Sequence, residues 1–376
     1  MESPTREPEY LSIRSVNIAL LHLSRVFRGA PLGFGSSTEA TMDLPGQRSR
    51  GPASGCDNIA GTEGKDTTLK KLRISIVEYL NTAPLVWGFT DGPLAGKYDL
   101  SFTVPSQCAE ALRRGDADIA IIPSIEYQRM EGVVALPAMA IAAKREVRSL
   151  LVVSKKPIEL AKRIALDTSS RSTVGLVRVL SKEHWRIQPE FVDAAPDAAE
   201  MLNQADAGLV IGDPALRISL KMEALSGKAP GGGDCCQGDP EDMPVPGFDT
   251  LFVYDVVHQW REMTGKPAVL AIWVGRRDTI TPEVVADFLA SKQYGLERVR
   301  EIAEAASIKL DLPPRALERY LTENIHFDLD SDNLAGLELY FEKAAAAGLI
   351  PRARRLEFVG GTAPSSAQRA SQTARS

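Results

Sequence analysis

Residues 73–85 read Arg73-Ile-Ser-Ile-Val-Glu-Tyr-Leu-Asn81-Thr82-Ala-Pro84-Leu85. Their β-branched beginning predicts a short strand, and apolar residues at helical spacing between positions 85 and 89 predict a helix after it. The polar turn between the two carries the amide of Asn81 and the hydroxyl of Thr82. In open α/β sheets, small ligands bind at such turns, beyond the carboxyl ends of the strands. The stretch therefore predicts an α/β fold with a ligand site at this turn.

The bulk composition is that of a globular protein and disfavours two kinds of partner. The length of 376 residues suggests two to three domains of about 100–200 residues each. The net charge of −5 argues against nucleic acid, which needs a basic face. No apolar run approaches the roughly 20 residues that span a bilayer, so no membrane partner is predicted.

The cysteines and the first residues favour a cytoplasmic protein without a metal site. The apolar stretch from Ile18 to Leu21 is too short for an export signal, and acidic residues precede it. The four cysteines form no disulfide framework and fit a reducing compartment. They are Cys56, Cys108, Cys235 and Cys236. The four histidines are scattered without ligand spacing to any cysteine, so no metal is predicted.

Strands and helices alternate between residue 71 and about residue 355. This alternation predicts a mostly parallel sheet with helices on both faces. Ser106 is expected to cap a helix from Gln107, and Thr281 a helix from Pro282. The predicted strands are Arg73–Val77, Leu100–Val104, Asp118–Ile122, Ser149–Val153, Arg163–Leu166, Ala207–Ile211, Thr250–Tyr254 and Ala268–Val274.

The middle of the chain, residues 148–256, has the pattern of an α/β unit of its own. It would form a second lobe inserted into a first lobe made of residues 71–147 and 257–355, with a cleft between the two. This two-lobed arrangement resembles the type 2 periplasmic-binding-protein fold. The low-complexity ends, 1–70 and 356–376, are expected to be disordered, and residues 226–246 to form an irregular, flexible surface insert.

A second polar turn, residues 167–173, has five hydroxyls and one arginine just before a helical pattern. Hydroxyls and free N–H groups at a helix start bind carboxylates well. The alternative is a simple N-cap, but a cap needs one hydroxyl rather than five. The turn therefore predicts an anion site.

Four single residues have two readings each. Ser124, after Pro123, either begins a helix or binds a ligand, and Asp213 either caps the helix from Pro214 or binds a ligand. Asn81 either ties down its turn or contacts the ligand. Ser149, at the head of an apolar strand, is equally open on pattern alone.

Several enzyme classes are not supported by any motif. The sequence has no G-x-S-x-G nucleophile elbow. It has neither a G-x-x-x-x-G-K-[ST] nor a G-x-G-x-x-G motif between a strand and a helix. An α/β-hydrolase and a nucleotide-binding enzyme are therefore not predicted.

Taken in series, the motifs resemble those of the chorismate dehydratases of the futalosine route to menaquinone. The resemblance covers about residues 71–350, and it departs from the family pattern at Ser172-Thr173, where the family has Thr-Ser, and at Ala268, where it has Phe. The matching motifs are Tyr79-Leu-Asn-Thr-x-Pro84-Leu85, Pro105-Ser-x-Cys108-Ala109, Gly115-Asp-Ala-Asp-Ile-Ala120, Ile122-Pro-Ser-Ile-Glu-Tyr127, Val147-Arg-Ser-Leu150, Leu166-Asp-Thr-Ser-Ser-Arg171, Leu209-Val-Ile-Gly-Asp213-x-Ala215-Leu216 and Trp260-x-x-x-Thr264-Gly265-x-Pro267.

The resemblance implies a lyase that works without cofactor or metal. Its substrate would be chorismate, and its product 3-[(1-carboxyvinyl)oxy]benzoate. It implies that Asn81 and Ser149 are catalytic; an amide is a poor base, so the enolpyruvyl carboxylate of the substrate is a candidate proton acceptor. The substrate-binding candidates are Thr82, Ser124, Ser170, Arg171, Ser172 and Asp213.

Three alternatives remain open from the sequence. One is a related cyclase that makes 1,4-dihydroxy-6-naphthoate, which would carry a histidine in its cleft; His258 comes closest. The second is a solute-binding protein of the same fold, which would carry an export signal. The third is a sensor domain, which would carry a DNA-binding motif. The oligomeric state is not predicted.

Overall fold

The computed structural model describes residues 71–359. The predictions for residues 1–70 and 360–376 lie outside the described residues. The predicted start of the disordered tail, residue 356, is too early. Phe358 is 5% exposed and forms a parallel bridge with Ala135. Burial of this ring holds the chain there, together with the hydrogen bonds of the Glu357 backbone to Ala135 and Tyr127.

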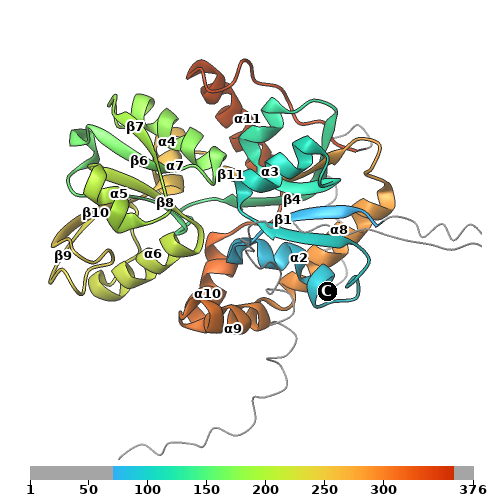
Figure 1. The fold of residues 1–376 in the computed structure, drawn as a ribbon, viewed down its shortest axis with the longest axis horizontal. Coiled ribbons are helices and arrows are strands. Elements are labelled where there is room, and N and C mark those ends of the chain that lie inside the picture. Colours follow the sequence, from blue (N-terminus) through green and yellow to red (C-terminus); the bar gives the residue numbers. More distant parts are fainter. Residues whose placement is uncertain (1–70, 360–376) are drawn as a thin grey trace, which may run out of the picture. The chain divides into compact units, whose positions relative to one another are not determined.

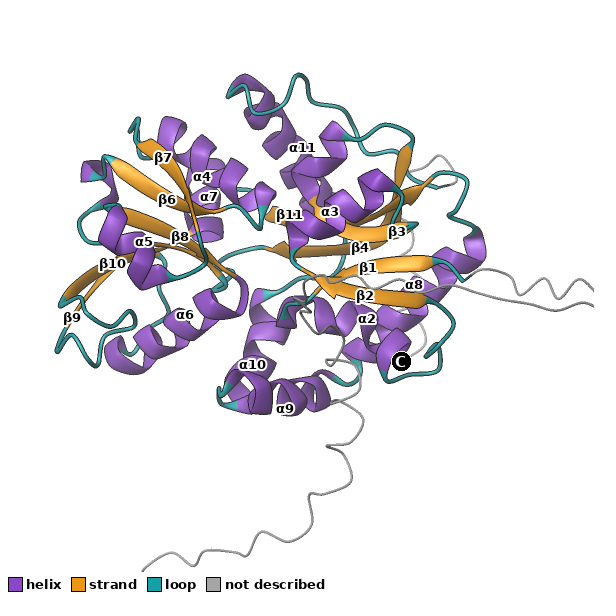
Figure 2. Cartoon of the chain, viewed as in Figure 1, coloured by secondary structure: helices purple, strands orange, loops and turns teal. Residues whose placement is uncertain are grey.

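The first sheet has five strands in the order β2-β1-β3-β11-β4 (Figures 1 and 2). Strands β1 and β2, and β1 and β3, pair in parallel. Strand β11 runs antiparallel to both β3 and β4. The bounds are β1 Arg73–Val77, β2 Asp99–Thr103, β3 Ile119–Pro123, β4 Val133–Ala143 and β11 Ala268–Arg276.

The second sheet has six strands in the order β7-β6-β8-β5-β10-β9. Strand β6 pairs in parallel with β7 and β8. The pairs of β5 with β8 and β10, and of β10 with β9, are antiparallel. The bounds are β5 Leu150–Ser154, β6 Arg163–Asp167, β7 Glu190–Ala194, β8 Ala207–Ile211, β9 Gly232–Gln237 and β10 Thr250–Asp255.

The expectation of one mostly parallel sheet is wrong. Among residues 71–359, five of the nine strand pairings are antiparallel. The reason is topological: the chain leaves the first sheet after β4 and returns by β11, and the strands on either side of these crossings run against their neighbours. Alternation along the sequence does not reveal such a crossing.

The stretch 226–246 is not irregular throughout. It contains β9, which pairs with β10, and Met243 and Val245 are buried. The sequence Gly-Gly-Asp-Cys-Cys-Gln has low strand propensity, so pairing with β10 decides its conformation.

The described helices cover both sheets (Figure 2). Thr281 caps α8 as predicted, accepting from Val284 N at 3.3 Å. Ser106 caps nothing, because α3 begins at Pro105, a residue suited to the first helical position. The predicted helix after Ser124 is a 3-10 helix. The bounds are α2 Ala83–Thr90, α3 Pro105–Arg114, α4 Arg171–Glu183, α5 Ala198–Gln204, α6 Gly212–Ser226, α7 Val256–Thr264, α8 Pro282–Leu296, α9 Val299–Leu310, α10 Pro314–Arg319 and α11 Ser331–Ala346, with 3-10 helices η1 Leu80–Thr82, η2 Ser124–Arg129 and η3 Ile158–Leu160 and a π-helical turn η4 Tyr320–Asn324.

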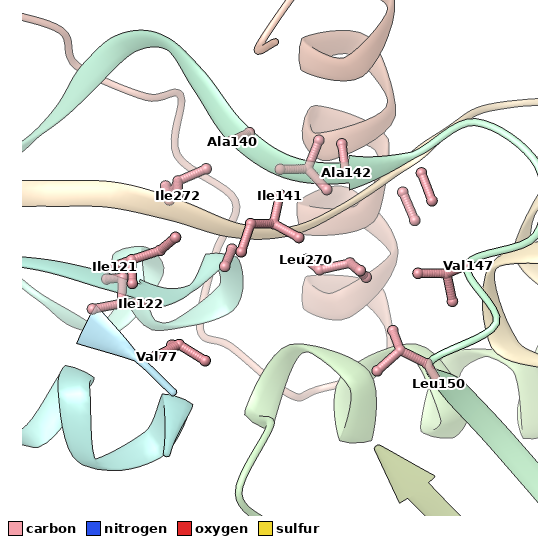
Figure 3. Close-up of a cluster of buried hydrophobic side chains, with 14 of the residues drawn as sticks. Val77, Ile121, Ile122, Ala140, Ile141, Ala142, Val147, Leu150, Leu270 and Ile272 are labelled. Atoms are coloured by element: carbon pink, nitrogen blue, oxygen red, sulfur yellow. The ribbon is translucent and has the colours of Figure 1, made fainter. Parts of the chain in front are cut away.

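A buried apolar cluster continues from the first sheet into the second. Figure 3 shows Val77, Ile141, Leu270 and Leu150 grouped where the chain passes from the first sheet into β5. Burial of apolar area of this kind is the dominant favourable contribution to folding. The crossing region is therefore part of the core.

Asp255 joins the two segments by which the chain crosses between the sheets. Its Oδ2 accepts from Val147 N at 3.0 Å and from Arg148 N at 2.6 Å. Its Oδ1 accepts from Val257 N and His258 N, each at 3.0 Å, and so caps α7. The residue is fully buried, and this burial raises the pKa of Asp255 to about 6. One carboxylate thus holds both crossing segments. The first of these segments continues directly into Ser149.

Candidate active site

A cavity lies where the two sheets meet and contains about 420 Å³ of space, open solvent included. Its walls are mostly apolar, and its polar side chains belong to Tyr79, Asn81, Ser170 and Thr173. Within residues 71–359, no charged side chain lines it. The lining residues are Val77, Tyr79, Asn81, Pro105, Pro123, Ile141, Leu150, Ser170, Thr173, Ile211, Gly212, Leu270 and Ala271.

The turn after β1 brings Asn81 to this cavity. Asn81 is 8% exposed and lies in η1. The Thr82 hydroxyl donates to Asn81 Oδ1 at 3.4 Å and is itself buried away from the cavity lining. The Asn81 amide is therefore tied into its turn, and the residue also lines the cavity; contact with a ligand stays a prediction.

Asp213 also holds the turn that carries Asn81. Its Oδ1 accepts from Leu80 N at 3.2 Å, so it does not act as the N-cap of α6. Burial raises the pKa of the Asp213 carboxyl. Asp213 is not among the cavity-lining residues.

Gly212, next to Asp213, makes room for Tyr79. Its φ is +68°, and a Cβ there would lie 2.8 Å from the Tyr79 ring. Tyr79 lines the cavity, with its hydroxyl 3.5 Å from Ser169 Oγ. A side chain at position 212 would displace this ring, which is part of the cavity wall.

The start of α4 supplies hydroxyls and backbone N–H groups. Ser170 stands at the N-cap position but makes no capping hydrogen bond; its hydroxyl pairs with Thr173 Oγ1 at 2.9 Å. Both residues line the cavity. The positive end of the helix dipole, without a side-chain cap, is thus available to an anion at the cavity.

Ser124 and Ser172 face each other away from the cavity lining. Their hydroxyls are 3.1 Å apart. Ser124 donates to Val269 O at 2.7 Å, and Ser172 accepts from Ile125 N at 3.2 Å. Both are completely buried, and the structure places them where they join η2, α4 and β11.

Arg171 contacts carboxylates of the protein. Its Nη1 lies 2.8 Å from Glu110 and 3.0 Å from Glu126. Glu126 is completely buried and is also paired with Arg113 and Arg129. Burial raises the pKa of Glu126, but the hydrogen bonds from Arg113 and Arg129 outweigh it, so the net shift is downward.

Ser149 is 1% exposed, and its hydroxyl accepts from the Tyr320 hydroxyl at 2.8 Å. Burial raises the pKa of the Tyr320 phenol, and the nearby side chain of Asn81 acts in the opposite direction. Tyr320 therefore lies beside Asn81 and bonds Ser149, although only Asn81 lines the cavity. Sequence reasoning missed Tyr320, because it lies in a helical pattern far along the chain and follows no strand.

The described histidines do not line the cavity. His258 Nε2 lies 3.4 Å from Glu262 on the same helix, α7, and His184 lies 3.8 Å from the same carboxylate. His326 is half-buried and bridges to Ala142. The fourth histidine, His22, is outside the described residues. No helix between residues 71 and 359 is long and apolar enough to cross a membrane.

Solved structures of similar proteins share the fold. Protein AF1704 from Archaeoglobus fulgidus aligns with a TM-score of 0.57 at 20% identity, over 74% of this chain and 98% of that chain. The alkanesulfonate-binding protein SsuA from Xanthomonas axonopodis pv. citri, bound to MOPS, aligns with a TM-score of 0.51 at 18% identity, over 75% and 94% of the two chains. The predicted two-lobed, periplasmic-binding-protein-like α/β fold is therefore confirmed.

Two sequence comparisons identify the family. A chorismate dehydratase from Thermus thermophilus is 27% identical over 271 residues, which is 72% of this chain and 93% of that protein. The model of a family described as menaquinone biosynthesis matches residues 72–346. This match spans both sheets and every residue predicted for the site. The chain belongs to the menaquinone biosynthesis family.

Proposed function

We propose that this protein is a chorismate dehydratase, a lyase that removes water from chorismate to give 3-[(1-carboxyvinyl)oxy]benzoate for menaquinone biosynthesis. The observation that carries the proposal is Asn81 at the cavity between the two sheets, with its amide oxygen bonded by Thr82 and its turn held by the bond from Leu80 N to Asp213. The family match and the dehydratase relative from Thermus thermophilus support it.

The cavity suits a small ring with carboxylate groups. Apolar side chains such as Val77, Ile141 and Leu270 would cover the ring. The hydroxyls of Ser170 and Thr173, with the N-terminus of α4, would bind one carboxylate through neutral donors. Arg171 would act indirectly, by holding the start of α4 against Glu110 and Glu126.

The reaction is a balanced elimination. The C3 hydrogen leaves as a proton, its electrons form a ring double bond, and the C4 hydroxyl leaves to give water and an aromatic ring. Asn81 would orient the substrate, because an amide is a poor general base. The enolpyruvyl carboxylate of the substrate would take the proton and pass it to the departing hydroxide, which leaves as water, so the reaction would need neither a metal nor a cofactor. Ser149 would donate a hydrogen bond where negative charge develops.

We further propose that residues 71–147 with 257–355, and residues 148–256, act as two lobes that close on the substrate. The contacts Asp213–Leu80 and Ser124–Ser172 join the two proposed lobes around the cavity. Closure around a ligand is common for two-lobed clefts. Small-angle scattering with and without substrate tests this, and identical curves would contradict it.

The deciding experiment is incubation of purified protein with chorismate, in the presence of EDTA and without nucleotide, followed by mass spectrometry. A product lighter by one water and with the spectrum of a substituted benzoate supports the proposal. Intact chorismate with a folded protein contradicts it and favours a binding protein or the cyclase. Cell fractionation tests the cytoplasmic location, which the cysteine pattern favours.

A further inference from the structure

The hydroxyl of Tyr320 lies between the two residues proposed to be catalytic. Its Oη donates to Ser149 Oγ at 2.8 Å, although the two residues are 171 positions apart in the chain. The side chain of Asn81 lies near the same hydroxyl and acts to lower the pKa of the phenol, against the larger upward effect of burial. Tyr320 therefore bonds Ser149 and lies beside Asn81, and it reaches them from a third part of the chain.

A π-helical turn holds Tyr320 in place. The turn η4 is closed by the hydrogen bond from Ile325 N to Tyr320 O at 3.2 Å. Its other end, Asn324, donates to Glu146 O at 3.4 Å. The turn thus contacts the first crossing segment at both Glu146 and Ser149. Such turns are frequent at functional sites, where they reorient a side chain within a helix.

The direction of the hydrogen bonds matters for Ser149. Tyr320 is completely buried, and this burial raises the pKa of its phenol above the usual value, so the phenol keeps its proton and donates it. A serine hydroxyl has one proton and two acceptor sites. Since Ser149 accepts from Tyr320, its own proton points elsewhere, and no described residue accepts it. The Ser149 hydroxyl therefore keeps a proton that it can donate.

The direction of the hydrogen bond to Asn81 is also defined. The Thr82 hydroxyl donates to Asn81 Oδ1, which assigns the amide oxygen to Thr82. The rest of the side-chain amide lies near Tyr320. Tyr320 thus bonds Ser149 directly and lies beside the Asn81 amide.

We propose that Tyr320 is a positioning residue for the dehydration: its hydroxyl directs the Ser149 proton toward the substrate and holds the Asn81 amide in its reactive orientation. This inference rests on the proposed function. Tyr320 does not line the cavity and acts through the other two residues. Its loss affects the transition state more than substrate binding.

The test is Tyr320→Phe, which removes the hydroxyl and keeps the ring. We expect kcat to fall on the order of 10- to 100-fold, less than for the loss of a donor that touches the substrate, while KM and the melting temperature change little. The matched control is Tyr98→Phe, another buried tyrosine, which donates to Asp287 and lies outside the cavity lining. It should retain wild-type kcat.

A double-mutant cycle separates positioning from a structural role. If Tyr320 acts through Ser149, the variant Ser149→Ala/Tyr320→Phe should be little slower than Ser149→Ala alone. Should Tyr320→Phe fold poorly, Asn324→Ala releases the other end of η4 with the phenol retained and should also lower kcat. The inference would be overturned if Tyr320→Phe kept the wild-type kcat, or if the double variant lost kcat by the product of the two single losses. Either result would leave the proposed function standing. Absence of turnover in the wild-type protein would overturn the proposed function and the inference with it.

Discussion

The carboxylate of Asp213 accepts the backbone N–H of Leu80 at 3.2 Å and so connects the start of α6 to the turn that carries Asn81. The two residues are 133 positions apart in the chain. Asp213 follows a strand of the second sheet, and Leu80 follows a strand of the first. This bond therefore ties the turn that carries Asn81 to the start of α6.

Asp213→Ala should lower kcat on the order of 10- to 100-fold, because the turn loses its anchor and Asn81 shifts. Asp213→Asn should lose much less, since its amide oxygen still accepts from Leu80 N. The measurement is the kcat of both variants with chorismate. Equal losses would show that the charge of Asp213, rather than its acceptor, matters.

Asn81→Ala should lower kcat by about 100- to 1000-fold, as does removal of a donor aimed at the transition state. The control is Asn203→Ala, which changes an exposed asparagine on α5 and should retain full activity. Steady-state kinetics and circular dichroism of both variants check this. Retained turnover in folded Asn81→Ala would remove Asn81 from the mechanism.

Gly212→Ala should raise KM, because its Cβ would displace the Tyr79 ring, which is part of the cavity wall. Gly227→Ala, at the other end of α6, is the matched control: its φ is +77°, and nothing lies within 4 Å of the added Cβ. Both variants should lose roughly 1–2 kcal/mol of stability from the left-handed backbone. A KM that rises equally in both would contradict the role of Tyr79.

Asp255→Asn should destabilise the protein by about 2–6 kcal/mol. An amide can replace only one of the two oxygens, so two N–H groups would face an NH₂, at about 1–3 kcal/mol each. Asp197→Asn is the control, because Asp197 caps α5 through one bond at the surface and asparagine caps equally well. Urea denaturation of both variants measures the difference.

Glu126 should contribute to stability in a pH-dependent manner. The pKa of its carboxyl is lowered in the folded protein from an unfolded value of 4.5. Its contribution is therefore complete above about pH 4.5 and is lost as the pH falls through the folded pKa. Denaturation of wild type and Glu126→Gln between pH 3 and 7 should show a difference that shrinks on acidification. A difference that stays constant would contradict the ion cluster as its source.

The predictable parts of the fold and site were those with local causes. Five of the predicted strands agree with the structure at their start or at both ends, since alternating β-branched residues and turn residues act over a few positions. The turn at Asn81 and the hydroxyl-rich start of α4 were found for the same reason. Strand β9 was missed, because its glycine-rich sequence is extended only through pairing with β10.

The hydrogen-bond and ion-pair partners of the polar side chains could not be predicted from the sequence in the same manner. Ser124, Ser172 and Arg171 belong to polar turns as predicted, but their hydrogen bonds and ion pairs are made within the protein. A helix start has several hydroxyls, and which of them faces the cavity depends on how α4 packs against η2. Only contacts between distant segments decide this.

The sequence by itself determined the fold class, the turns that carry Asn81 and Ser170, and the family, because strand and helix periodicity and the motifs are local properties of the chain. Tertiary structure alone decided that Asp213 anchors the Asn81 turn, that Arg171 pairs with Glu126, and that Tyr320 bonds Ser149. The physical reason is that these contacts join residues tens to hundreds of positions apart. Their geometry exists only once the two sheets have packed around the crossing segments.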